Sequence, residues 1–148
     1  MREYELHRRL GYRVSRLSRI MQARLERGLA PFGLTRLMWC VLTGVGDEGI
    51  SNPSELADYI GITRPATSRL LKDMVAKGLV CRNGGSSDGR TIELSLTGAG
   101  ADVLKQSRVA VESMNSHFMT KLSPEMTAQF MHALDVLSAD EHERLTKL

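Results

Sequence analysis

The sequence predicts a mainly α-helical fold with one small β-hairpin, and three observations lead to that prediction. Long stretches at both ends place an apolar residue at every third or fourth position, which is the spacing of amphipathic helices. In the centre, two short helical patterns are joined by a three-residue turn that contains glycine, which is typical of a helix-turn-helix. Two strand patterns joined by a glycine-rich loop follow, and a helix-turn-helix with such a β-hairpin wing is a winged helix.

The composition is that of one ordinary soluble domain, which we expect to span residues 1–148. Hydrophobic residues make up 42% and charged residues 25%, and a chain of this length can bury a core without disulfides. No apolar run approaches the roughly 20 residues of a membrane span. The N-terminus lacks the apolar region of a secretory signal, and the two cysteines form no CxxC pattern. A cytoplasmic protein without membrane partners is expected.

The N-terminal part is predicted to form one long helix and one short buried helix. The first covers residues 4–28, where the faces that are not apolar are rich in arginine, and "APFG" at 30–33 ends it. Residues 34–44 are apolar on almost every side, so we expect a short buried helix with Trp39 at its centre. The apolar positions of the long helix are Leu6, Leu10, Val14, Leu17, Met21 and Leu25.

The central helices are recognised by the residues at which they begin. Asn52 is a good N-cap, Pro53 suits the first helical position, and Gly61 ends this short helix. Thr63 can cap the next helix, which we expect over residues 63–77. Together the two helices form the predicted helix-turn-helix.

Two strands and two long helices complete the predicted fold. The stretch "LVCR" at 79–82 is an apolar run with β-branched character, and residues 91–96 alternate apolar with polar side chains as a half-buried strand does. The stretch "NGGSSDGR" at 83–90 joins them. Thr97 is expected to cap a helix over 98–121, and Ser123 with Pro124 to start a last helix over 124–147.

The outward face of the 63–77 helix carries side chains suited to reading duplex DNA. Arg69 could donate two hydrogen bonds from its guanidinium to one guanine. Lys72 is a point charge, which suits phosphate. Residues 61–90 hold six basic against two acidic side chains, which favours an anionic partner. A plain amphipathic surface helix would explain the helix pattern alone equally well. The DNA contacts expected from this helix are Thr63, Arg64, Pro65, Thr67, Ser68, Arg69 and Lys72.

The loop at 83–90 is longer and more glycine-rich than a hairpin of this length needs, since most close in about two to five residues. A thin loop can enter the narrow minor groove of DNA, where Arg90 would meet negative potential. Asp88 could orient that guanidinium, and Arg82 at the base of the loop could bind phosphate. The alternative for Asp88 and Arg90 is an exposed ion pair of little energetic weight.

These motifs resemble the MarR family (multiple-antibiotic-resistance-type regulators). The resemblance rests on "KGLVCR" at 77–82, "DGR" at 88–90 and "LTGAG" at 96–100, and it extends to the order of elements along the whole chain. The glycine-rich loop departs from the charged loops common in relatives. The resemblance implies an obligate homodimer in which residues 1–30 and 98–148 interlock with a partner, while residues 34–97 form the DNA-binding lobe.

In such a dimer the two reading helices would lie one DNA turn apart, about 34–36 Å, over a pseudo-palindromic operator. The terminal helices agree with this, because three long amphipathic helices have no core of their own unless they pair. A repressor that a small effector releases from its operator is the function that the resemblance implies.

The resemblance also bears on small-molecule sensing. Some relatives bind anionic aromatic compounds between the dimer helices and the DNA-binding lobe, and side chains that could line such a pocket here are Arg16, Arg36, Met38 and Trp39. Such residues are more often simply core. Other relatives sense peroxides through a cysteine in the first helix, which this chain lacks. Cys40 is expected to be an inert core residue, and Cys81 lies in a predicted strand.

No pattern indicates an enzyme, a metal site or a cofactor. The four histidines lack metal-binding spacing, and no nucleophile stands beside a base in a known motif. The remaining alternative is a winged helix used as a protein-interaction module, which would need neither an arginine in its loop nor a polar reading face. The operator, the effector and the regulated genes are not readable from the sequence.

Overall fold

The computed structural model of the chain describes residues 5–84 and 91–145. Within these residues the fold is mainly helical with one antiparallel hairpin, as predicted. Two 3-10 turns, Leu6–Arg8 and Ala30–Phe32, flank the first helix. The elements are α1 (Leu10–Leu29), α2 (Arg36–Gly46), α3 (Pro53–Ile60), α4 (Arg64–Ala76), β1 (Val80–Gly84), β2 (Ile92–Leu96), α5 (Gly98–Met119) and α6 (Pro124–Ser138).

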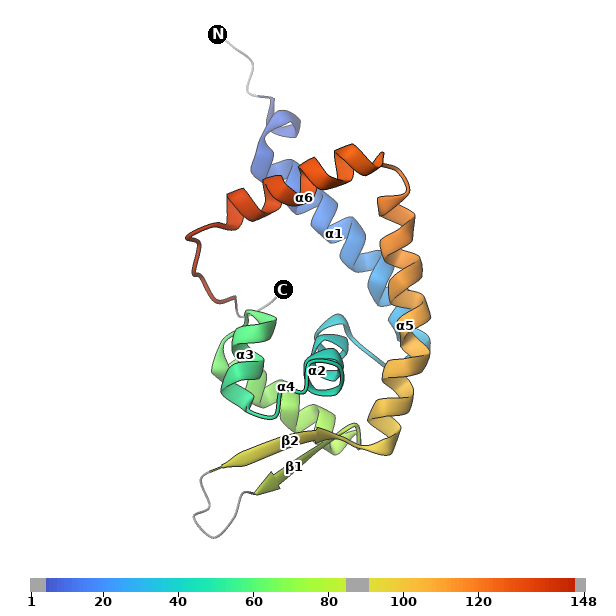
Figure 1. Cartoon of the computed structure of the whole chain (residues 1–148), viewed down its shortest axis with the longest axis vertical. Coiled ribbons are helices and arrows are strands. Elements are labelled where there is room, and N and C mark those ends of the chain that lie inside the picture. The colour runs from blue at the N-terminus through green and yellow to red at the C-terminus, as the bar shows by residue number, and fades with distance from the viewer. Residues whose placement is uncertain (1–4, 85–90, 146–148) are drawn as a thin grey trace.

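The elements gather into a compact lobe and a group of long helices (Figure 1). The lobe holds α2, α3, α4 and the hairpin. Helices α1 and α5 pack against each other and rise from the lobe, and α6 crosses at the end far from the hairpin. This arrangement separates the surface around α4 from the outer ends of the long helices.

The core lies mainly in the lobe. Leu42, Leu56 and Leu71 come from three different helices and are 0% exposed. From α1 only Leu25 and Leu29 join this core. Burial of an aliphatic side chain of this size contributes roughly 1.5–3 kcal/mol, so the lobe carries most of the stability of the single chain.

Each of the predicted N-caps is confirmed. The side chains of Asn52, Thr63, Thr97 and Ser123 all accept a hydrogen bond from a backbone N–H two or three residues later. Caps of this kind contribute about 1 kcal/mol each. They fix where α3, α4, α5 and α6 begin.

The "LTGAG" segment joins the hairpin to α5 by close backbone contact. The Thr97 hydroxyl donates to the Gly78 carbonyl at 2.6 Å, and the Thr97 N–H donates to the Leu79 carbonyl at 3.1 Å. A Cβ on Gly100 would lie 2.0 Å from the Leu79 carbonyl oxygen. Only glycine therefore lets α5 approach the start of β1 this closely.

Two terminal predictions were wrong in their boundaries. The first helix begins at Leu10 rather than at residue 4, after an extended Arg9. The last helix ends at Ser138 rather than at residue 147, and Asp140 adopts a left-handed conformation with φ 64°. Three acidic residues follow Ser138 within five positions, and negative charge at a helix C-terminus opposes the helix dipole.

The hairpin also differs from the prediction. Strand β1 reaches Gly84, which pairs with Ile92, so the pairing continues two residues into the stretch expected to be loop. The segment between the strands begins after Gly84, and Asp88 and Arg90 lie outside the described residues.

Within the described residues no single helix is long and apolar enough to cross a membrane. Only the stretch 10–32 taken together with α2 has that length and composition, and the two are bent by 72°. Much of α2 is buried in the lobe core, as expected of a core helix. The cytoplasmic location expected from the sequence stays a prediction.

Candidate nucleic-acid interface

Helix α4 has one face in the core and one face in solvent. Leu71 and Met74 are fully buried, and Ala66 and Leu70 are partly buried beside them. The remaining face is exposed and carries mainly charged and polar side chains, together with Pro65 and Val75. The exposed residues predicted to contact DNA are Arg64, Pro65, Ser68, Arg69 and Lys72, while their cap Thr63 is half-buried.

The prediction for Thr67 was wrong. Its side chain is 1% exposed, and its hydroxyl donates to the Thr63 carbonyl at 3.0 Å. This bond satisfies the hydroxyl inside the helix, which lets a polar residue take a core position. Thr67 therefore packs α4 against the lobe instead of offering its hydroxyl to a partner.

A shallow cavity of about 170 Å³ marks the place where three elements converge. The start of α3 contributes Pro53 and Ser54, and the hairpin contributes Arg82. The α4 side is formed by Arg64, Thr67, Ser68 and Leu71, with the buried Thr67 and Leu71 contributing only to the floor. The cavity thus brings Arg64 and Ser68 of α4 together with Arg82 of β1, which the sequence places on a different element.

Sequence reasoning missed Pro53 and Ser54 as part of this surface. The signal was present in the helix-turn-helix pattern, because the first helix of that motif crosses the DNA backbone next to the reading helix. The Ser54 N–H is occupied by the Asn52 side chain at 2.8 Å, which leaves the Ser54 hydroxyl as the group that can meet a ligand.

Four exposed cations of α4 and β1 have no acidic partner among the described residues. Arg64, Arg69 and Lys72 project from α4 and Arg82 from β1, and all four are exposed. The ion pairs within residues 5–84 and 91–145 join Glu5 to Arg8, Asp47 to Arg108 and Asp58 to Arg144, so none of them involves these four cations. Unpaired cations on one surface are free to neutralise phosphates.

The hairpin packs on the lobe at its base and is exposed toward its tip. Val80 and Leu94 are buried at 2% and 3% exposure, and Arg82, paired in register with Leu94, is exposed. The Leu94 N–H donates to the Ser51 carbonyl at 2.8 Å, which ties β2 to the segment before α3. The strands therefore hold Arg82 at a fixed position relative to α4.

The side chains predicted to line an effector pocket do not all gather. Arg36 and Trp39 are half-buried on α2, and the Arg36 Nε and Trp39 Nε1 atoms are buried without a hydrogen-bond partner among the described residues. Met38 is 4% exposed within the core cluster, so the ligand role predicted for it is not supported. Arg16 lies on the exposed part of α1, well before Leu25, the first buried residue of that helix.

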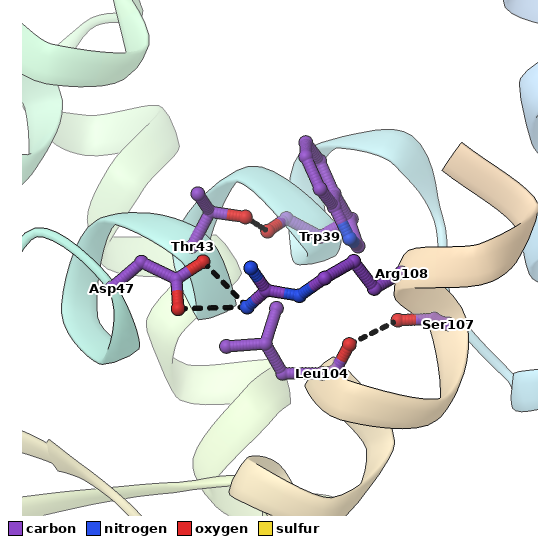
Figure 2. A network of polar contacts seen from close by, with 6 residues as sticks. All are labelled: Trp39, Thr43, Asp47, Leu104, Ser107 and Arg108. Carbon is purple, nitrogen blue, oxygen red and sulfur yellow. Dashed lines mark hydrogen bonds and ion pairs between the residues drawn. The ribbon is translucent and has the colours of Figure 1, made fainter. Parts of the chain in front are cut away.

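One ion pair connects the lobe to the long helices beside Trp39. The Arg108 guanidinium on α5 donates from Nη2 to both carboxylate oxygens of Asp47, at 2.8 and 2.9 Å. In Figure 2 the Arg108 side chain reaches across to Asp47, with Trp39 and Leu104 on either side of it in this view. The pair is about half exposed, so it contributes at most about 1 kcal/mol.

Burial lowers the reactivity of Cys40. Burial raises the pKa of the Cys40 thiol, and the nearby Arg36 opposes this to a smaller degree. Cys40 therefore stays a thiol near neutral pH, which is the less reactive form. Across the part of the chain that the structure describes, no group of three or more histidine, cysteine or acidic side chains could hold a metal ion.

Comparison with known proteins finds a family model that is similar to the lobe. The model of the MarR family matches residues 32–91. The chain is similar to the HTH-type transcriptional repressor Mb2911 of Mycobacterium bovis, with 24% identity over 131 residues that cover 88% of this chain and 94% of the repressor.

Solved structures share the fold over most of the chain. A mutant of MarR from E. coli, crystallised with operator DNA, superposes with a TM-score of 0.79 at 24% identity, covering 86% of this chain and 92% of that one. CouR from Rhodococcus jostii, crystallised with p-coumaroyl-CoA, superposes with a TM-score of 0.80 at 19% identity, covering 93% and 97%. At these identities the structural likeness establishes the fold.

Proposed function

We propose that this chain, a member of the MarR family, is a transcriptional regulator that binds double-stranded DNA as a homodimer and represses the genes beside its operator. One observation carries the proposal: Arg64, Arg69, Lys72 and Arg82 are exposed and have no ion pair among the described residues, and the first three lie on the second helix of a helix-turn-helix. Such a helix enters the major groove, and the neighbouring cations neutralise phosphates.

Within this proposal the residues have different roles. Arg69 reads a base edge, since its planar guanidinium can bond a guanine at two points. Lys72, Arg64 and Arg82 bind phosphate, and Ser54 at the start of α3 lines the cavity together with Arg64 and Arg82. Arg90, oriented by Asp88, enters the minor groove. In this proposal the protein binds and releases DNA, and none of its residues has a catalytic role.

The partner in the proposed dimer is a second copy of this chain. Helix α6 buries none of its residues, and the outer part of α1 is equally uncovered. The exposed apolar side chains of these helices and the flanking turn include Leu6, Leu10, Val14, Leu17, Ile20, Met126, Phe130, Met131, Val136 and Leu137. A stable monomer rarely leaves so much apolar surface in water.

The charges of the two ends support the same partner. Residues 1–36 carry nine arginines against three acidic side chains, whereas residues 123–148 carry five acidic against two basic ones. In a two-fold dimer the basic first helix of one copy and the acidic C-terminal part of the other can face each other.

We also propose a small anionic effector with an aromatic or otherwise flat apolar part. The unpartnered Arg36 Nε and Trp39 Nε1 can both donate to an anion or a carbonyl oxygen. Both residues belong to α2, and Trp39 lies beside the Asp47–Arg108 pair, so a ligand bound at Trp39 would act at the junction between the lobe and α5. The protein-interaction alternative is not favoured, because it gives the unpaired cations of α4 no role.

Alanine substitutions at Arg69 and Lys72 test the proposed DNA contacts. For Arg69→Ala we expect a loss of about 1–3 kcal/mol of operator binding and relaxed preference at one base position. For Lys72→Ala we expect weaker binding to all sequences alike and a salt slope reduced by about 1. Mobility shift over a series of salt concentrations, with DNA recovered from co-purification, measures both.

The exposed lysine Lys105 on α5 supplies a matched control, since Lys105→Ala removes the same charge away from the proposed surface. The affinity of the Lys105→Ala variant for DNA should equal that of the wild type. Equal losses for Lys72→Ala and Lys105→Ala would contradict the proposed interface, and a uniform loss across sequences for Arg69→Ala would contradict its base-reading role.

A further inference from the structure

The segment that follows α6 also contacts the lobe. After Ser138 it leaves α6 and returns along an extended path to the lobe, where it meets the end of α3 (Figure 1). We name residues 139–145 the C-terminal strap. It spans from the helix proposed to bind the partner subunit to the helix-turn-helix.

The strap pairs with the turn between α3 and α4 through its backbone. The Leu145 N–H donates to the Gly61 carbonyl at 3.0 Å, and the Thr63 N–H donates to the Leu145 carbonyl at 3.1 Å. Together these bonds form a parallel bridge between Leu145 and Ile62. The strap thus holds the middle and both ends of the three-residue turn.

An ion pair reinforces this contact next to the turn. The Arg144 guanidinium contacts the carboxylate of Asp58, on the last turn of α3. Both side chains are about half exposed, at 46% and 52%. An exposed pair adds little energy, but it fixes the register of the strap against α3.

The contacted turn is the point from which the reading helix starts. Gly61 has φ 81°, a left-handed conformation that turns the chain out of α3, and Ile62 is 0% exposed. Thr63 is the N-cap of α4, and its hydroxyl accepts from the Ala66 N–H. Its own N–H precedes the helix, so the strap supplies a partner that α4 cannot.

We propose that the C-terminal strap positions α4 for DNA reading, with Leu145 and Arg144 as positioning residues. The inference rests on the proposed function, because it concerns how the reading helix is held. It gives the dimer helices a further connection to the lobe besides α1 and α5. Movement of α6 in the dimer is thereby transmitted to Thr63, and the strap makes recognition depend on the state of the dimer interface.

Proline at position 145 tests the backbone contact, because Leu145→Pro removes the N–H that bonds Gly61. Leu145→Ala is the matched control, since it shortens the same side chain and keeps the N–H. We expect amide exchange at Thr63 to rise about five-fold or more in Leu145→Pro, which corresponds to one lost hydrogen bond. In Leu145→Ala the exchange rate should stay near that of the wild type.

DNA binding of the same variants separates positioning from plain stability. The affinity for DNA recovered from co-purification is compared with the affinity for a scrambled duplex of equal length. We expect the ratio of these two affinities to fall about five-fold or more in Leu145→Pro, at an unchanged salt slope. Equal weakening on both duplexes, or tighter operator binding, would overturn the positioning role. Unchanged Thr63 exchange would overturn the strap itself.

Reversal of the ion pair gives an independent check. Asp58→Arg alone should reduce the preference for the recovered DNA, and adding Arg144→Asp should restore it. If the double variant is no better than the single one, Arg144 is not a positioning residue. If the wild type binds neither duplex, the proposed function fails, while Thr63 exchange still decides whether the strap holds the turn.

Discussion

An aspartate in place of Phe130 is expected to turn the proposed dimer into a monomer and to remove tight operator binding. Phe130 lies on the exposed apolar face of α6, which would be covered by the second copy. A carboxylate buried there without a partner costs several kcal/mol. Because α6 buries nothing in its own chain, the lobe should stay folded.

The loss of DNA affinity should be large. Two reading helices on one duplex bind as a bivalent ligand, and loss of that bivalency lowers affinity by roughly 10²–10⁴-fold. Sedimentation at several protein concentrations gives the subunit mass, and mobility shift gives the affinity. His132→Asp is the control, because steps of about 100° place His132 on the opposite face of α6. If the Phe130→Asp variant is still a dimer, α6 does not form part of the interface.

Alanine at Gly100 is expected to cause the largest loss of stability in the lobe. The added Cβ would lie 2.0 Å from the Leu79 carbonyl oxygen, and backbone on both sides leaves little room for relaxation. The Thr97 N–H bonds that same carbonyl, so moving α5 away also strains the joint between hairpin and helix. We expect the free energy of unfolding to fall by about 3 kcal/mol or more.

Urea denaturation at one fixed protein concentration measures this change, since the stability of a dimer depends on concentration. Gly98→Ala is the matched control on the same first turn of α5, where an added Cβ has nothing within 4 Å. It should be neutral or slightly stabilising, because alanine favours a helix. Equal effects of the two substitutions would contradict the close approach of Gly100 to Leu79.

The sequence could predict those parts of the fold that depend on local signals. Asn52, Thr63, Thr97 and Ser123 are short polar residues placed before apolar repeats, and all four cap helices as expected. Their bonds close within three residues, so no distant part of the chain has to be known. The same holds for the alternation that identifies β2.

Local signals failed where packing decides. Thr67 has a polar side chain and was assigned to the DNA surface, but its bond to the Thr63 carbonyl lets it enter the core. Leu145 continues the apolar spacing of α6, yet the chain leaves the helix at Ser138 and Leu145 pairs with Ile62 instead. The spacing of apolar residues cannot show that a distant part of the backbone will bind Leu145.

The sequence predicts which residues of α4 face the candidate site, but not which residues of other elements lie next to them. Arg69 and Lys72 follow from the polar side of one helix, but their neighbours across the surface depend on how three elements meet. Ser54 and Arg82 line one cavity with Arg64 although they lie far apart in sequence. The exposed faces of α1 and α6 show the same limit, because the partner proposed for them belongs to another chain.

The most direct test of the account is the mass of the complex between the protein and the DNA that co-purifies with it. Native mass spectrometry counts the chains on each duplex, and mobility shift over a salt series measures the electrostatic contribution to affinity. We predict two identical chains on one duplex and an affinity that falls steeply with salt. One chain per duplex, or no salt-dependent affinity for double-stranded DNA, would contradict the central claim.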